Sequence, residues 1–130
     1  MRIFKTKWFA RFARRERISD RSLCEAVRRA QRGLVDADLG GGVIKQRIAR
    51  PGQGRSGGYR ALIAYRHGAR AVFLYGFAKS ERDNVNDDEL ETARDIASGW
   101  LAANMSQIAR AIEDELIQEV AYDDGKEKEA

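Results

Sequence analysis

The sequence is poor in the residues that cross-link or stiffen a chain. It has one cysteine, one proline and one histidine in 130 residues. A single cysteine excludes an intrachain disulfide, and Cys24 and His67 alone cannot supply the four ligands of a structural zinc site. Cys24 lies in the apolar repeat "LCEAV", so we expect it to pack against other helices.

Long apolar runs are also missing. No stretch approaches the roughly 20 apolar residues that cross a bilayer, and "MRIFKTKWFARFARRER" lacks the apolar core of a secretory signal. We therefore expect a cytoplasmic protein with no membrane partner. The length suits a single domain, which we place at residues 1–122. Residues 123–130 contain no large apolar side chain and are predicted to form a disordered acidic tail.

Acidic residues are scarce in the first part of the chain. Residues 1–82 hold 20 Lys and Arg against 6 Asp and Glu, whereas residues 83–130 hold 4 against 14. A body this basic attracts polyanions such as nucleic acid. The acidic residues 83–130 either pack against the basic residues 1–82 and neutralise part of their charge, or project as a solvated tail.

Local patterns predict a short strand and two helices at the N-terminus. The strand is expected at Ile3 and Phe4, and the second helix is expected to begin at its cap Ser19 and end at Gly33. The first helix has one basic face. The apolar stripes of the two helices consist of Trp8, Phe9, Phe12 and Ala13 and of Leu23, Val27 and Ala30.

Three strands are predicted after the connection "LVDADLGGG". In "VIKQRIA", residues 43–49, alternation places Lys45 and Arg47 on one face. The runs "GYRALIAYR" and "RAVFLYGFA" are joined at "HGA", which is typical of a β-hairpin, and Arg60 belongs to the first run. The glycine-rich "PGQGRSGG" is predicted to be an exposed, mobile loop with Arg55 near its tip.

A third helix is predicted from Asn86, which can form a capping box with Glu89. The chain is expected to break near "NMSQ" before a shorter helix from about residue 106, and "ELIQEVAY" is either its continuation or a last strand. The third helix has an apolar stripe of Leu90, Ala93, Ile96, Ala97, Trp100 and Leu101. Together these elements predict an α+β fold with two N-terminal helices packed on a small, mainly antiparallel twisted sheet, followed by a C-terminal helix or helices.

The stretch from "GGGVIKQRIARPGQGRSGGYRALIAY" through "AVFLYGFAKSERDNVNDDEL" resembles the RelE superfamily of toxins from type II toxin-antitoxin pairs, and most of all its HigB-like branch. Three motifs carry this resemblance: a strand with spaced basic residues, the "GGYR" opening of the next strand, and "YGFAKSERDN" closing the third. The order of elements matches over residues 1–103, and the motifs match between residues 40 and 90. The resemblance implies a RelE-like fold.

The resemblance also implies an endoribonuclease that cuts messenger RNA, usually on the ribosome, without a metal or other cofactor. RNA carries its own nucleophile, the 2′-hydroxyl, so the enzyme has to align the backbone, move a proton and stabilise the phosphate. A further implied partner is a co-expressed antitoxin that silences the toxin. We expect the antitoxin to be a helix-turn-helix protein encoded nearby.

When the site residues of the family are matched to this sequence position by position, the resemblance implies a catalytic set of Lys45, Arg47, Arg60 and Lys79. Arg60 in "GGYR" matches the phosphate-binding arginine, whose planar fork can hold two phosphate oxygens. Further RNA-binding residues are predicted at Arg50, Arg55, Tyr75 and Arg82. The sequence departs from the pattern at Ser80 and Asn86, where relatives often have an arginine and a tyrosine. Arg55, Tyr75 and Arg82 are the candidates to compensate.

Two other classes of function fit the same scaffold. ParE-like toxins resemble RelE in fold but poison DNA gyrase and cut no RNA, and the basic set present here disfavours that alternative. A non-catalytic module that binds RNA or an antitoxin would show salt-sensitive affinity without cleavage. The sequence leaves both alternatives open.

Overall fold

The fold is built on one six-stranded sheet. The computed structural model describes residues 1–50, 54–82 and 84–121, with the side chains of residues 54–56 outside that description, so the predicted tail 123–130 lies outside the described residues. The elements are β1 (Arg2–Thr6), α1 (Lys7–Glu16), α2 (Asp20–Gln31), β2 (Ala37–Gly40), β3 (Val43–Arg50), β4 (Gly54–Arg66), β5 (Arg70–Ala78), α3 (Asp87–Ala102), α4 (Met105–Glu113) and β6 (Ile117–Val120). The strand order is β2-β3-β4-β5-β1-β6. The described pairings are antiparallel except that of β1 with β5.

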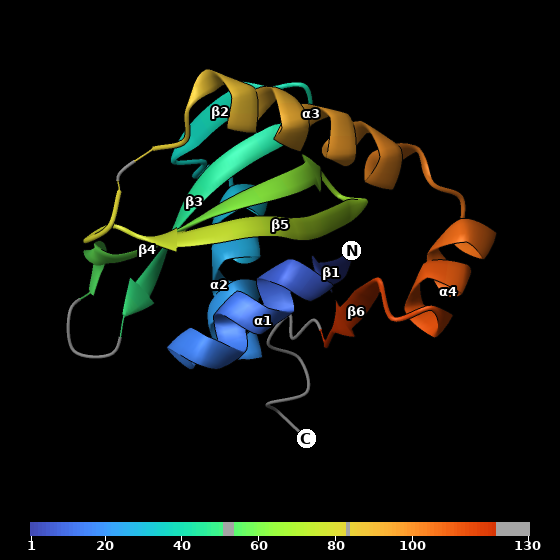
Figure 1. Cartoon of the computed structure of the whole chain (residues 1–130), viewed down its shortest axis with the longest axis horizontal. Coiled ribbons are helices and arrows are strands. Elements are labelled where there is room, and N and C mark those ends of the chain that lie inside the picture. The colour runs from blue at the N-terminus through green and yellow to red at the C-terminus, as the bar shows by residue number, and fades with distance from the viewer. Residues whose placement is uncertain (51–53, 83, 122–130) are drawn as a thin grey trace.

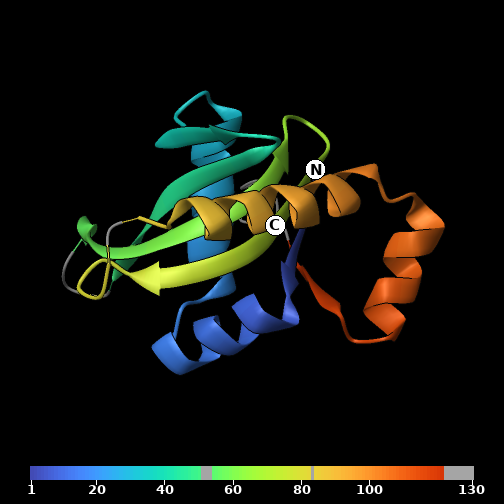
Figure 2. The same cartoon turned by 45° about the horizontal axis from the view of Figure 1, so that its top comes forward.

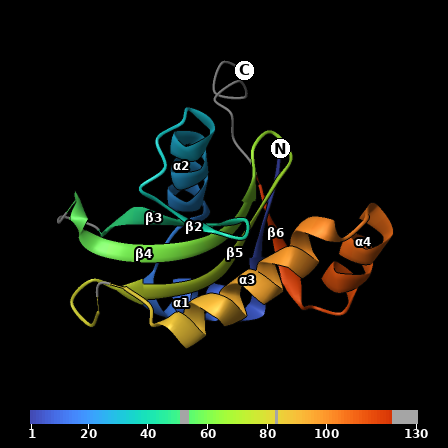
Figure 3. The ribbon, with the colours of Figure 1, turned by 90° about the horizontal axis from the view of Figure 1, so that it is seen from above.

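The sheet separates two apolar cores. Helices α1 and α2 cover one face, and α3 covers the other (Figures 1 and 2). Ile63 and Phe73 face the core under α1 and α2, whereas Leu62 and Val72 face the core under α3. Helix α4 lies beyond the C-terminal end of α3, away from α2 (Figure 3), and adds Ile108 to the second core. The predicted α+β class is confirmed, with two N-terminal helices packed on a mainly antiparallel sheet and two C-terminal helices after it.

Capping side chains begin the helices where the sequence predicts. Ser19 accepts a hydrogen bond from the Ser22 amide at 3.2 Å before α2. Asn86 and Glu89 complete the capping box of α3, with bonds of 2.9 and 2.8 Å. The predicted break is also present, because Asn104 caps a separate helix α4. The segment "ELIQEVAY" contributes the strand β6, which pairs with β1.

The segment predicted as a plain connection contains the edge strand β2. Its pairing runs from Ala37 opposite Lys45 to Gly40 opposite Val43, with an irregularity between them. A segment of only four residues that is followed by Gly41 and Gly42 has a low β propensity of its own. The hydrogen bonds offered by the long strand β3 therefore decide the conformation of this segment.

Strand β4 begins at Gly54, four residues earlier than the sequence suggests. Ile48 pairs with Tyr59 but Arg50 pairs with Gly54, so a register shift separates the two ends of the β3–β4 ladder. A Cβ atom on Gly58 would lie 2.2 Å from the Ile48 carbonyl oxygen. Glycine is therefore required at position 58 for close approach of two backbones, and the predicted role in loop mobility is wrong there. Residues 51–53 of the predicted loop lie outside the described residues.

Two apolar side chains that the helical stripes predict to be buried are exposed. Trp8 is 62% exposed and Ile96 is 46% exposed. The sheet contacts only the middle of each helical stripe, so residues at the margin of the stripe stay accessible. The helices bury Phe9, Ala10, Phe12 and Ala13 in α1 and Ala93, Ala97 and Leu101 in α3.

Candidate functional site

Basic and aromatic side chains from three strands meet on the sheet face that α3 partly covers. Lys45 and Arg47 of β3 point to this face, as the alternation of the strand predicts. Arg47 pairs with Arg60 of β4, which in turn pairs with Phe77 of β5. Directly paired residues place their Cβ atoms about 5 Å apart. Arg47, Arg60 and Phe77 therefore form one row across three strands.

A β-bulge in β5 determines which way Tyr75 points. Ile63 pairs with Phe73, but the preceding residue Leu62 pairs with Tyr75, so Leu74 is an extra residue in β5. Strict alternation would send Tyr75 to the same side as Phe73, into the core under α1 and α2. The bulge instead places Tyr75 beside Leu62 on the α3 side of the sheet.

The bulge completes a second row parallel to the first. Lys45 pairs with Leu62, and Leu62 pairs with Tyr75. The Tyr75 ring is 42% exposed, and its centre lies 6.0 Å from that of Phe77. We call the surface formed by Lys45, Arg47, Arg60, Tyr75 and Phe77 the basic face.

Arg47 is held by two residues that sequence reasoning missed. Asp36, which precedes β2, accepts hydrogen bonds from the Arg47 amide at 2.7 Å and from Arg47 Nη2 at 3.1 Å. Arg29 of α2 donates to Asp36 Oδ2 at 3.2 Å and also to the Arg47 carbonyl. Partial burial alone would raise the pKa of Asp36, but the hydrogen bonds from Arg47 and Arg29 hold that pKa below its ordinary value of 3.8. Asp36 is therefore ionised at neutral pH.

Arg60 is the most deeply buried cation of the basic face. Its residue is 6% exposed, and its Nη1 lies 3.4 Å from the Tyr59 carbonyl oxygen. A charge that is screened from water interacts more strongly with an opposite charge than an exposed one does. Because Arg60 pairs with Arg47 on one side and with Phe77 on the other, it lies at the centre of the face.

The connection from β5 to α3 borders the basic face. The Arg82 guanidinium lies 5.5 Å from the Phe77 ring centre and forms two hydrogen bonds with Glu89, one of 3.0 Å. Asn84 accepts from Arg82 Nε through its carbonyl at 2.8 Å and from Lys45 Nζ through its side chain at 3.5 Å. Hydrogen bonds from Arg82 and from the N-cap amide of α3 lower the pKa of Glu89. The ionised pair fixes Arg82 over the Phe77 ring.

The other predicted site residues are spread more widely. Lys79 begins the turn after β5, and its side chain is exposed. Arg50 is on the opposite side of the sheet from Arg47, where its guanidinium lies 5.5 Å from the ring centre of Tyr59. The structure therefore does not bring Arg50 to the basic face. The side chain of Arg55 lies outside the description.

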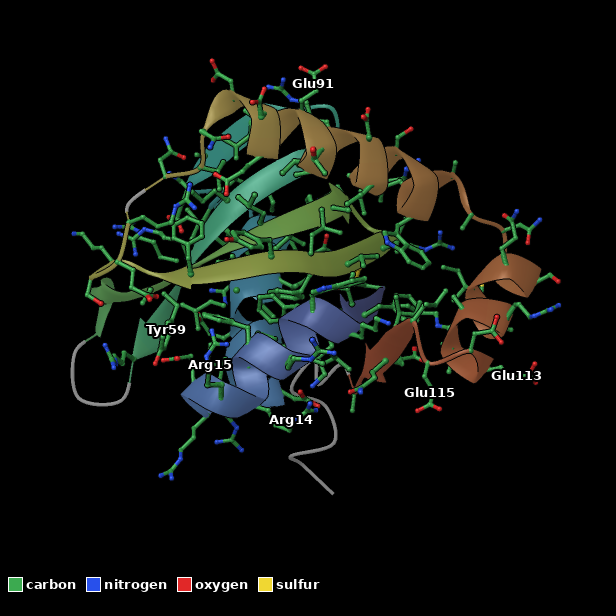
Figure 4. All side chains as sticks on the ribbon, in the orientation of Figure 1. Arg14, Arg15, Tyr59, Glu91, Glu113 and Glu115 are labelled. Carbon is green, nitrogen blue, oxygen red and sulfur yellow. The ribbon has the colours of Figure 1, made fainter. Side chains whose placement is uncertain are left out.

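Charged side chains line the helices on both sides of the sheet. Figure 4 shows Arg14 and Arg15 on α1 and Glu91 on α3, with the sheet between them. The acidic final third also neutralises part of the basic body, because Glu119 of β6 accepts two hydrogen bonds of 2.8 Å from Arg2. Within the described part of the chain, no cluster of three or more His, Cys, Asp or Glu is placed to hold a metal ion.

The fold and the basic face define an α+β protein that presents arginine, lysine and tyrosine side chains on a twisted sheet. The family model described as the RelE toxin of the RelE/RelB toxin-antitoxin system matches residues 1–120. The chain therefore belongs to the RelE toxin family, and it is the toxin component of a toxin-antitoxin system. A search of curated proteins finds no match.

Family membership confirms the resemblance to the RelE superfamily. The assignment to the HigB-like branch and the extent of the domain, residues 1–122, remain predictions. Over the residues that the structure describes, none of the helices combines the length and apolar character of a membrane span.

Proposed function

We propose that this toxin inhibits translation by cleaving messenger RNA, with the basic face as its active site. The observation that carries the proposal is the pair of cross-strand rows that bring Lys45, Arg47 and Arg60 together beside Tyr75. RelE family toxins are ribonucleases, which supports the same assignment. The chemistry of these side chains matches what RNA cleavage requires.

Cleavage can use the nucleophile that RNA itself contains. The 2′-oxygen attacks the adjacent phosphorus, the bond from phosphorus to the 5′-oxygen breaks, and the products carry a 2′,3′-cyclic phosphate and a 5′-hydroxyl. Arg60 and Arg47 can bind the phosphate oxygens as negative charge increases on them in the transition state. Lys45 and Lys79 are the candidates to accept the 2′-hydroxyl proton and to supply one to the leaving 5′-oxygen.

Tyr75 gives the site an accessible ring for a base. Aromatic side chains on a sheet stack on unpaired RNA bases, and Tyr75 is 42% exposed whereas Phe77 is 4% exposed. Asn86, at the position where relatives often have a tyrosine, caps α3 instead. We propose that Tyr75 replaces that missing tyrosine. Unpaired messenger in the ribosome fits this way of binding, so we propose ribosome-dependent cleavage without a metal.

The proposed partners follow from the family and from the chemistry. The RelE/RelB family implies a cognate antitoxin. We propose that it is a helix-turn-helix protein encoded in the neighbouring reading frame, and that the toxin acts on messenger RNA in the cytoplasm. Arg82, fixed over Phe77 beside the face, is the further contact proposed for the RNA backbone.

Expression of the toxin without its antitoxin tests the proposal. We expect growth arrest, new 5′ ends inside coding sequences by primer extension, and recovery when the antitoxin is co-expressed. The double variant Lys45→Ala, Arg47→Ala is the matched control and should leave transcripts intact. Intact transcripts in cells arrested by the wild-type protein would contradict the proposal. Loss of plasmid supercoiling in those cells would favour gyrase poisoning instead.

A further inference from the structure

Asn84 is the centre of a small hydrogen-bond network in the connection from β5 to α3. Its backbone carbonyl accepts from Arg82 Nε at 2.8 Å. Its side-chain oxygen accepts from the Val85 amide at 3.0 Å and from Lys45 Nζ at 3.5 Å. Asn84 therefore joins strand β3 of the basic face to the segment that leads into α3.

The N-terminus of α3 fixes the position of Asn84. Glu89 accepts two hydrogen bonds from Arg82, and it also accepts from the Asn86 amide at 2.9 Å in the capping box of α3. A functional group that is supported by a capped helix and by further hydrogen bonds keeps one geometry. Because Arg82 in turn donates to the Asn84 carbonyl, the first turn of α3 sets where Asn84 lies.

Lys45 has one polar contact on its side of the sheet. The residue is partly buried and pairs with Ala37 of β2 and Leu62 of β4, neither of which offers a polar side chain. Within the described part of the chain, Asn84 is the one group that accepts a hydrogen bond from the Lys45 side chain. Lysine has a long, flexible stem, so a fixed acceptor decides where Nζ lies. The 3.5 Å contact is weak enough to leave the Nζ proton available for transfer.

The amide of Asn84 orients Lys45 without adding a charge beside it. The two carboxylates nearby, Asp36 and Glu89, are each paired with arginine. The other charged or titratable groups on the surrounding elements are Arg47, Arg60, Tyr75, Arg82 and Arg94. A carboxylate at position 84 would therefore be a new acidic partner for Lys45, and it would favour the protonated amine.

We propose that Asn84 is a positioning residue that holds Lys45 Nζ at the basic face for proton transfer during RNA cleavage. The inference rests on the proposed function, in which Lys45 takes one of two roles. As the base, its neutral amine takes the 2′-hydroxyl proton and becomes an ammonium group. As the acid, its ammonium group gives a proton to the leaving 5′-oxygen and becomes the amine. Either role requires Nζ to lie close to the reacting oxygen.

The pH dependence of single-turnover cleavage by the purified toxin tests this role. Asn84→Asp keeps the shape of the side chain and adds a negative charge beside Nζ. The limb of the pH–rate profile that reports Lys45 should therefore move to higher pH by about one pH unit. The direction is the same for a base and for an acid, because the carboxylate favours the ammonium form in both cases. Asn84→Ala removes the acceptor and should slow cleavage about tenfold without moving that limb to higher pH.

Asn104→Asp is the matched control. Asn104 caps α4, which lies away from the basic face, and its side-chain oxygen accepts from the Gln107 amide at 2.8 Å. Aspartate caps a helix as well as asparagine does. This variant should therefore cleave RNA within about twofold of wild type and keep the wild-type pH profile. Thermal unfolding confirms that each variant is folded.

NMR of the toxin labelled with ¹³C in its lysine side chains tests the contact without RNA. The Lys45 signal is assigned by its loss in Lys45→Arg, and the pH at which half of Lys45 is protonated should be higher in Asn84→Asp than in wild type. An unmoved midpoint in a protein that cleaves RNA would overturn the positioning role alone. A raised midpoint with an unmoved cleavage limb would also overturn it, because the Lys45 proton would then not control cleavage. A wild-type toxin that cleaves no RNA would instead overturn the proposed function.

Discussion

The Asp36 carboxylate holds Arg47 by both its backbone and its side chain, through hydrogen bonds of 2.7 Å to the amide and 3.1 Å to the guanidinium. Arg29 links the same two residues to helix α2. An arginine that is oriented before substrate binds loses less conformational freedom when it contacts a phosphate. Asp36 is therefore a positioning residue for the proposed site.

Asp36→Asn should lower the free energy of unfolding at pH 7 by about 1–2 kcal/mol, because Arg29 and Arg47 lose an ionised, partly buried partner. The folded state lowers the pKa of Asp36, so the ionised carboxylate stabilises the fold above about pH 4. That contribution is lost as pH falls through the pKa of the folded state. The difference between wild type and variant should therefore shrink in acid. Urea unfolding at pH 7 and pH 3 measures it, and equal differences at both would contradict the prediction.

Arg60→Ala should slow RNA cleavage about a hundredfold, and by more than Lys45→Ala or Arg47→Ala alone. A phosphate contact that strengthens in the transition state is worth roughly 3 kcal/mol. Arg60→Lys keeps the charge without the planar fork and should recover only part of the rate. Single-turnover cleavage by equal amounts of folded protein measures these effects. Since Arg60 is 6% exposed, circular dichroism of each variant provides the control. Full toxicity of all three alanine variants would place the site elsewhere.

Tyr75→Phe and Tyr75→Ala separate stacking from hydroxyl chemistry. The Phe variant keeps a ring beside Phe77 and should cleave RNA within about twofold of wild type, whereas the Ala variant should lose about tenfold, because stacking on one base is worth roughly 1–3 kcal/mol. The rates are measured with purified toxin in the absence of antitoxin. An equal loss in both variants would assign the role to the hydroxyl.

Gly58→Ala should destabilise the protein by about 2 kcal/mol or more. Its Cβ atom would lie 2.2 Å from the Ile48 carbonyl oxygen, and a backbone atom cannot swing aside as a side chain can. Gly99→Ala is the control, because no atom lies within 4 Å of its added Cβ and the residue is on the exposed side of α3. Alanine there should stabilise the helix by roughly 0.5–1 kcal/mol. Urea unfolding compares the two, and a Gly58→Ala protein as stable as wild type would refute the close approach.

The sequence by itself determined the features that depend on neighbours along the chain. Ser19, Asn86 and Asn104 cap helices because each side chain bonds an amide three residues ahead. Lys45 and Arg47 share a face because side chains alternate along any strand. The same rule sends Arg50 to the other side, so its separation from the basic face was also readable from the sequence.

Only the tertiary structure decided the features that depend on a partner far along the chain. Leu74 is an extra residue where β5 pairs with β4, and this bulge turns Tyr75 out of the core under α1 and α2. The bulge could not be predicted from β5 alone, because the register depends on both strands. Asp36 meets Arg47 because β2 pairs with β3, and Asp36 itself carries no local signal of that contact. Trp8 is 62% exposed although it belongs to the apolar stripe of α1, because the packing of α1 on the sheet, which no pattern within α1 encodes, decides which part of the stripe is covered. The basic residues of β3 and their shared face were thus predictable, whereas the place of Tyr75 beside them and the hold of Asp36 on Arg47 required the packed fold.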